Sequence, residues 1–201
     1  MSANLRTTIL LTVTAIMLVA IGGLFYYQVA NRGTERSVMA SAPIGAPFEL
    51  IDHNGDPITE KAMAGKPVAV FFGFTHCPEI CPTTLYEMAG WLEALGQEGA
   101  DIDGYFITVD PTRDTPEIME SYVTSFTDRI IGITGDPDRV AELAKAWHIY
   151  WRKVPLDDGD YTMDHTASVF LVDRQGHLKS VIAFGEESET AIEKLRNLAA
   201  S

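Results

Sequence analysis

The chain has 201 residues, which leaves room for an N-terminal segment and one domain of ordinary size. Its 15 lysines and arginines against 28 aspartates and glutamates give a formal net charge of -13. A chain this acidic is a poor candidate for binding nucleic acid, because phosphate backbones attract clusters of basic side chains. The acidic surface would suit a cation or a basic protein partner, although a well-solvated surface explains it more simply.

The first 30 residues predict a single transmembrane helix that serves as a membrane anchor. No charged residue occurs in Thr7–Ala30, and a helix of this length spans about 36 Å, more than the roughly 30 Å of a hydrocarbon core. The alternative is a cleaved signal peptide, since residues 40–42 (Ala-Ser-Ala) resemble a cleavage site. The length of the apolar run, and Pro43 directly after those residues, favour a retained anchor.

Residues 31–46 are small and polar and predict a flexible linker, so we expect the soluble domain to occupy residues 47–201. Positive charges flank the apolar run almost equally, with Arg6 on one side and Arg32 and Arg36 on the other. Charge therefore does not orient the anchor. A very short N-terminal tail is compatible with export of the domain.

Strands and helices are expected to alternate along the domain. Asn54-Gly55 between short apolar stretches predicts a β-hairpin over residues 47–59. The apolar run 68–74 predicts a buried strand, and Pro82–Leu95 has the apolar spacing of a helix. The remaining expected elements are strands at 104–109 and 130–134, helices that begin at Pro116 and Pro137, a hairpin over 150–161, strands at 167–172 and 178–183, and a closing helix at 188–198. This order predicts an α/β domain with a mixed central sheet flanked by helices.

Cys77 and Cys81 are the only cysteines of the chain, and they stand where the strand at 68–74 turns into a helix. Free N–H groups and the positive end of the helix dipole stabilise a thiolate there, and a thiolate is both a nucleophile and a metal ligand. A structural disulfide is the alternative. Closing so short a loop would contribute only about 2 kcal/mol, and a chain of this length can bury a core without it. We therefore favour a functional pair.

Three motifs resemble, in order and spacing, the signatures of the Sco/SenC family. They are GFTHCPEICP at 73–82, DPTRDTP at 110–116 and DHTA at 164–167. The order of elements likewise resembles the thioredoxin fold, and the resemblance covers the chain from about Pro43 to its end. Members of this family are membrane-anchored copper proteins that help to assemble the dinuclear copper (CuA) site of cytochrome c oxidase. One departure is Thr83-Thr84, where many relatives carry acidic residues.

The resemblance implies copper, as Cu(I), Cu(II) or both, bound by Cys77, Cys81 and His165. Two thiolates and an imidazole are soft ligands that suit Cu(I), and a set of three leaves a position open for transfer. The two cysteines would form a redox-active disulfide when oxidised, so copper loading requires their reduction. The implied partners are cytochrome c oxidase subunit II or another copper-site client, other copper chaperones and thioredoxin-like reductants. The implied location is the bacterial inner membrane, single-pass, with the domain on the periplasmic side.

Several roles stay open when only the residues are considered. A lone histidine before an apolar strand is usually structural, so the ligand role of His165 rests on the resemblance. His76 is a rival ligand, and Met163 could offer a thioether sulfur. A polar turn could support the site, dock a partner or simply fix its own shape, and it contains Asp110, Arg113 and Asp114.

We expect a metallochaperone rather than an enzyme. The alternative is a thiol–disulfide oxidoreductase that reduces the client's CuA-site cysteines, and a peroxide-reducing or redox-sensing thiol protein is a third possibility. Redox thioredoxins use Cys-x-x-Cys, whereas one more residue separates Cys77 from Cys81. A pure reductase also has no need of His165.

Overall fold

The computed structural model describes residues 17, 21–23, 47–157 and 159–201. The expected anchor at 1–30 and linker at 31–46 lie outside the described residues, apart from positions 17 and 21–23. Within the described part of the chain, no helix is both long and apolar enough to cross a membrane. The chain divides into two compact units, Met1–Ala42 and Pro43–Ser201, and every described strand belongs to the second.

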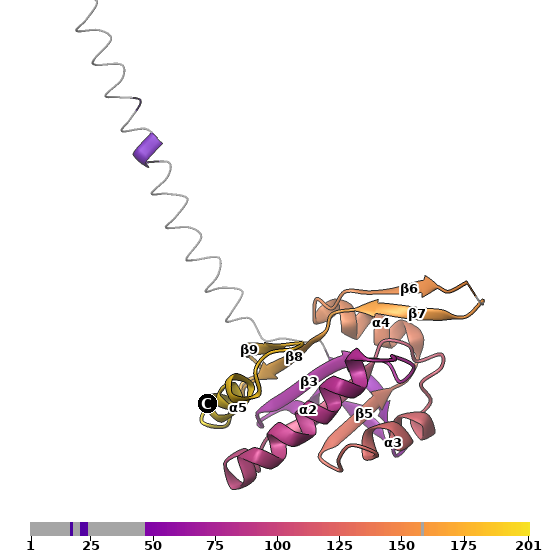
Figure 1. Ribbon diagram of the computed structural model, residues 1–201, viewed down its shortest axis with the longest axis horizontal. Coiled ribbons are helices and arrows are strands. Elements are labelled where there is room, and N and C mark those ends of the chain that lie inside the picture. Colours follow the sequence, from indigo (N-terminus) through magenta and orange to yellow (C-terminus); the bar gives the residue numbers. More distant parts are fainter. Residues whose placement is uncertain (1–16, 18–20, 24–46, 158) are drawn as a thin grey trace, which may run out of the picture. The chain divides into compact units, whose positions relative to one another are not determined.

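A seven-stranded mixed sheet forms the centre of this unit, in the order β2-β1-β5-β4-β3-β8-β9 (Figure 1). Strand β3 runs parallel to β4 and antiparallel to β8, and β4 runs parallel to β5. The predicted mixed sheet is therefore confirmed. The strands are β1 (Glu49–Asp52), β2 (Pro57–Thr59), β3 (Val68–Gly73), β4 (Asp103–Thr108), β5 (Ile130–Thr134), β8 (Ser168–Val172) and β9 (Leu178–Ala183).

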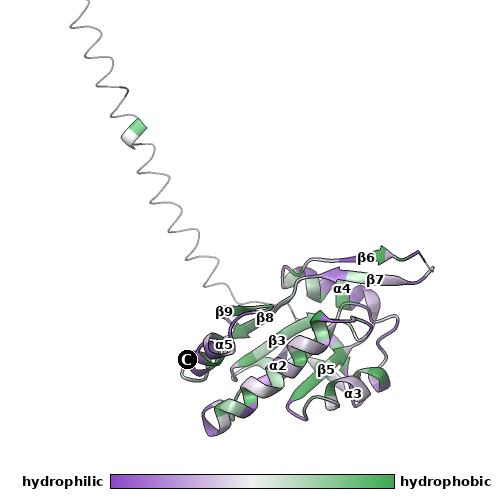
Figure 2. Cartoon of the chain, in the orientation of Figure 1, coloured by the Kyte–Doolittle hydropathy of each residue, from purple (hydrophilic) through white to green (hydrophobic). Residues whose placement is uncertain are grey.

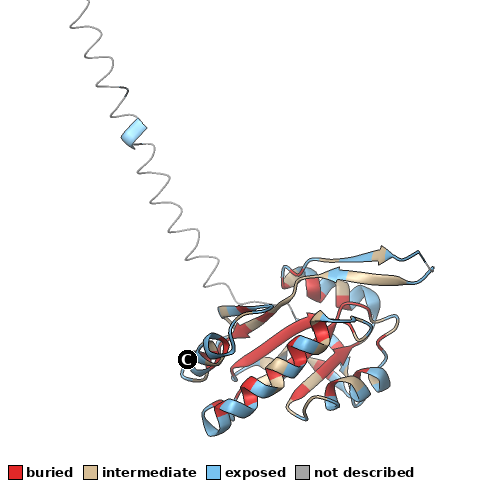
Figure 3. Cartoon of the chain, viewed as in Figure 1, coloured by how far each residue is buried: buried red, intermediate tan, exposed pale blue. Residues whose placement is uncertain are grey.

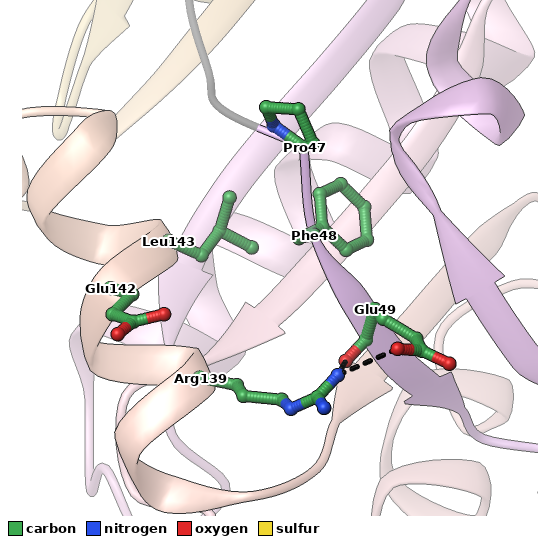
Figure 4. Close-up of a pocket in the computed structure, with 6 residues that line it drawn as sticks. All are labelled: Pro47, Phe48, Glu49, Arg139, Glu142 and Leu143. Atoms are coloured by element: carbon green, nitrogen blue, oxygen red, sulfur yellow. Dashed lines mark hydrogen bonds and ion pairs between the residues drawn. The ribbon is translucent and has the colours of Figure 1, made fainter.

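The N-terminal hairpin forms as its turn residues predict, and Gly55 adopts a φ of +87° between β1 and β2. It extends the central sheet beyond β5, because β1 pairs antiparallel with that strand. Helix α4 (Pro137–Ala146) is tied to the same edge. Arg139 donates hydrogen bonds to the carboxylate and the carbonyl oxygen of Glu49 at 2.8 and 3.3 Å (Figure 4). The shallow pocket between them contains no thiol or imidazole.

The other helices are α2 (Ile80–Leu95), α3 (Pro116–Thr124) and α5 (Ser188–Ala199), with two 3₁₀ turns, η1 (Glu60–Met63) and η2 (Gly96–Gly99). Thr115 caps α3, because its hydroxyl oxygen accepts from the N–H of Ile118. Asp136 caps α4 in the same way, accepting from two N–H groups. Both helices begin with proline, which fits a position where no N–H partner is needed.

Strand β3 is buried along its whole length and carries helices on both sides of the sheet (Figures 1 and 3). Neighbouring side chains of a strand point to opposite faces. Phe71 stacks on Phe106 with ring centroids 5.8 Å apart, and Phe106 lies beside Tyr122 of α3. Phe72 instead contacts Trp147 at the end of α4, at 5.5 Å. The sheet is therefore flanked by helices, as predicted for this fold class.

Strands β6 (Trp151–Pro155) and β7 (Tyr161–His165) form a separate two-stranded sheet that stands apart from the central one (Figure 1). The hairpin was expected over residues 150–161, and its second strand in fact continues to His165, opposite Trp151. Every residue of both strands is intermediate or exposed, and most are hydrophilic (Figures 2 and 3). This hairpin therefore rests on the domain with little burial.

Candidate metal centre

The two cysteines lie in the turn that joins β3 to α2. The N–H of Cys77 donates to the carbonyl oxygen of Phe74 at 3.3 Å, which closes the turn. Helix α2 begins at Ile80, so Cys81 lies in its first turn, and its N–H donates to the Sγ of Cys77 at 3.4 Å. Cys81 is fully buried, whereas Cys77 is partly exposed. The predicted place of the pair at a helix start is confirmed.

The end of β3 packs directly against the buried sulfur. A Cβ atom at Gly73 would lie 2.7 Å from the Sγ of Cys81 and 2.7 Å from the ring of Phe106. Contacts this short are not tolerated, so only glycine allows the sulfur to sit over the strand.

His165 reaches the cysteines from the hairpin. Its Nε2 lies 3.4 Å from the Sγ of Cys81, and its ring meets those of Phe71 and Phe74 edge-on, at 6.0 and 5.8 Å. Its Nδ1 lies 3.0 Å from the carbonyl oxygen of Thr166, which can only accept, so Nδ1 carries the proton. The lone pair of Nε2 is thereby directed toward the sulfur, as in histidines that bind metals.

The three predicted ligand residues form one group. The two Sγ atoms and a ring nitrogen of His165 all lie within 4.8 Å of one another. Bonds of about 2.1 to 2.3 Å to a metal at the centre of a triangle would place the ligand atoms about 3.6 to 4.0 Å apart. Small side-chain shifts therefore suffice for a three-coordinate ion, and the group fits copper in its chemistry and its spacing.

The two thiols differ in acidity. The hydrogen bond donated by the Cys81 thiol, helped by backbone N–H groups, lowers the pKa of Cys77 to about 4 although partial burial opposes it. Burial raises the pKa of Cys81 above that of an ordinary thiol, and the neighbouring Cys77 adds to this effect. At neutral pH the pair therefore holds one proton, on Cys81, and Cys77 is a thiolate. Binding a metal to both sulfurs must release that proton.

His76 lies outside the three-ligand group. Its Nδ1 is 3.1 Å from the hydroxyl of Thr75 and 3.8 Å from the carboxylate of Asp114. Asp114 is fully buried and also accepts from the N–H and hydroxyl of Thr75 at 3.1 and 2.6 Å, and from the hydroxyl of Thr108 at 2.5 Å. The polar turn after β4 thus fixes the segment that precedes Cys77, a contact that no sequence pattern indicated.

A groove of about 390 Å³ opens beside the candidate ligands. Met163 lines it together with Cys77 and His165, so its thioether lies near the group without belonging to the sequence-predicted ligand set. Tyr150 also lines the groove and is 57% exposed. Sequence reasoning missed Tyr150 as a neighbour of the site, because it becomes one only through the tertiary position of the hairpin.

Comparisons with known proteins identify the same family as the motifs. The family model described as SCO1/SenC matches residues 37–200. The mitochondrial protein SCO2 of Saccharomyces cerevisiae is 34% identical over 195 residues, covering 91% of this chain and 64% of its own. The chain spans about 40% to 66% of the length of the first curated relatives it matches.

Solved structures agree in fold. Copper-bound ScoI of Bradyrhizobium japonicum is 44% identical, with a TM-score of 0.71 over 77% of this chain and 99% of its own. BsSco, described as a member of the Sco family of cytochrome c oxidase assembly proteins, is 21% identical over 80% of this chain and 96% of its own, and it shares the fold with a TM-score of 0.64. Homologous structures therefore hold copper, and the Cys-Cys-His group of this chain can bind it.

Proposed function

The chain belongs to the SCO1/SenC family, and we propose that it binds copper and delivers it to the CuA site of cytochrome c oxidase during assembly of that enzyme. The observation that carries this proposal is the gathering of Cys77, Cys81 and His165 within 4.8 Å. The copper-bound ScoI structure, 44% identical, supports copper as the cargo.

We further propose the order in which the ligands act. Cys81 is fully buried, whereas Cys77 and His165 are partly exposed and line the groove. A thiolate of the client can approach copper from the side of Cys77 and displace that ligand first. Three-coordinate Cu(I) then passes to the client by exchange of one ligand at a time, so that the ion is never released to water.

We propose roles for the remaining parts of the chain from their sequence and from the family to which the chain belongs. Residues 1–30 anchor the protein in the bacterial inner membrane, residues 31–46 are a flexible linker, and residues 47–201 are the copper-binding domain on the periplasmic side. The client is subunit II of cytochrome c oxidase or another copper-site protein. Other copper chaperones and thioredoxin-like reductants load copper and keep the cysteines reduced.

An anaerobic Cu(I) titration tests the copper assignment. The reduced domain from residue 31 onward is titrated against a competing chelator, and we expect one tightly bound copper per chain that is lost when the cysteines are oxidised. Cys77→Ser and Cys81→Ser should each abolish tight binding. Wild-type affinity in either variant would refute the ligand assignment.

A second candidate function is thiol–disulfide exchange with the client. A partly exposed thiolate at Cys77 beside the protonated Cys81 matches the arrangement of an attacking and a resolving cysteine. Substitution of His165 distinguishes copper binding from thiol–disulfide exchange. His165→Ala should weaken copper retention yet leave the rate of exchange with a disulfide-bonded client peptide unchanged, whereas Cys77→Ser should abolish both.

A further inference from the structure

The sulfur and nitrogen halves of the candidate centre come from different parts of the fold. Cys77 and Cys81 follow the fully buried strand β3, whereas His165 ends a hairpin whose two strands contain no buried residue. Trp151 and Met163 touch the edge of the core, but a cavity of about 190 Å³ lies between the hairpin and α4. Because little apolar surface fixes the hairpin, its position depends on polar contacts to the domain.

Arg113 makes those contacts. Its Nε donates to the carboxylate of Asp110 at 2.5 Å, and its Nη1 donates to the carbonyl oxygen of Tyr161 at 3.0 Å and to Asp160 at 3.2 Å. The guanidinium also stacks over the ring of Tyr161, 3.7 Å from its centroid. The hydroxyl of Tyr161 closes the arrangement by donating to Asp110 at 2.9 Å. Strand β7 is therefore fastened at its first residue, and His165 is its last.

The same loop also fixes the sulfur half. Asp114, the residue after Arg113, accepts the N–H and hydroxyl of Thr75, two residues before Cys77. The loop from Asp110 to Asp114 therefore contacts the cysteine turn on one side and the histidine hairpin on the other. This five-residue segment therefore holds the sulfur ligands and the nitrogen ligand in place relative to each other.

We propose that Arg113 is a positioning residue for the histidine half of the copper site, acting through Tyr161 and strand β7. The inference rests on the proposed copper-binding function. With the contact intact, the Nε2 of His165 faces the Sγ of Cys81. When the contact is lost, the hairpin moves more freely and copper is retained by two thiolates. Contact between Arg113 and the hairpin therefore sets how fast copper leaves.

Arg152 provides a matched control. It lies on β6 in the same hairpin and donates to Asp164 at 2.6 Å, directly beside His165. Both partners of this ion pair belong to the hairpin, and both are well exposed, at 63% and 48% of their side chains. Arg152→Gln therefore removes an equal charge and an ion pair close to the ligand without loosening the hairpin from the domain.

The test compares Arg113→Gln with Arg152→Gln in the full-length protein in detergent. We expect Arg113→Gln to speed the transfer of Cu(I) to a chelator about 10- to 100-fold, the range found for residues that orient a metal ligand. The amides of β7 should also exchange their hydrogens faster in the copper-free protein. Arg152→Gln should match the wild type in both measurements. Equal effects of the two substitutions would overturn the proposal.

A double-mutant cycle distinguishes positioning from a general loss of stability. In a His165→Ala background, Arg113→Gln should have no further effect on copper transfer, because the ligand through which it acts is gone. An equal acceleration in both backgrounds would refute the positioning role. Tyr161→Phe removes only the hydroxyl contact with Asp110 and is the milder variant if Arg113→Gln folds poorly. Its effect should be smaller and in the same direction.

The two proposals fail in different ways. If the wild-type protein retains no copper, the proposed function fails. Hydrogen exchange of β7 still decides the inference, since unchanged protection in Arg113→Gln would show that Arg113 does not fix the hairpin. If the wild type retains copper but Arg113→Gln transfers it at the wild-type rate, only the inference fails.

Discussion

The unequal acidity of the two cysteines leads to a quantitative prediction for the reduced, copper-free protein. With a pKa of about 4, Cys77 is about 90% ionised at pH 5, whereas a thiol with a pKa of about 8.5 is roughly 0.03% ionised. A less basic thiolate is a weaker nucleophile, and a Brønsted slope of about 0.45 lowers its intrinsic rate about 100-fold. The two factors leave Cys77 about 30-fold more reactive at pH 5 than an ordinary cysteine.

The assay is alkylation by iodoacetamide under anaerobic conditions, with modification of each cysteine followed by mass spectrometry. The rate at Cys77 should be level from pH 8 to about pH 5 and halve near pH 4, because protonation removes the nucleophile there. Cys81 should stay unmodified, since it is buried and its pKa is raised. The protein unfolded in guanidinium is the control. A rate at Cys77 that climbs about tenfold per pH unit between 6 and 8 would refute the reasoning.

Four further predictions concern the site and the chain around it. Copper loading releases the proton of Cys81, so the apparent Cu(I) affinity should rise about tenfold from pH 7 to pH 8 in chelator competition, and a flat profile would contradict this. His165→Ala should weaken copper retention while leaving the Tm measured by calorimetry nearly unchanged. Gly73→Ala should lower the free energy of unfolding by about 1 to 3 kcal/mol in urea titrations, because its Cβ would lie 2.7 Å from the Sγ of Cys81. Gly90→Ala, in a helix with no atom within 4 Å of the new Cβ, is the control that should not destabilise. Membranes washed with carbonate should retain the full-length protein if residues 1–30 are a retained anchor.

Local signals made most of the domain predictable. The caps at Thr115 and Asp136, and the Asn54-Gly55 turn, depend on contacts within a few residues, so the sequence places them closely. Alternation of strands and helices then indicates the mixed sheet. The separation of β6 and β7 from that sheet was not predictable in this way, because strand pairing is decided by distant partners.

The candidate site was predictable only in part. Cys77 and Cys81 lie four positions apart and stand at a helix start, so their chemistry follows from local structure. His165 lies 84 residues from Cys81 in the sequence. Only the family resemblance predicted that the two residues share one site. The contact between Arg113 and Tyr161 spans 48 residues, and no periodicity or spacing indicates such a pair.

The hairpin that carries His165 separates two properties that most metal sites combine, namely the stability of the fold and the lifetime of the bound ion. Its strands pair only with each other, and none of their residues is buried, so substitutions at their exposed positions should barely change the stability of the domain. The sulfur half, in contrast, is continuous with the buried strand β3. Over evolution, the lifetime of the bound ion could therefore change through the hairpin while selection for a stable fold acted elsewhere.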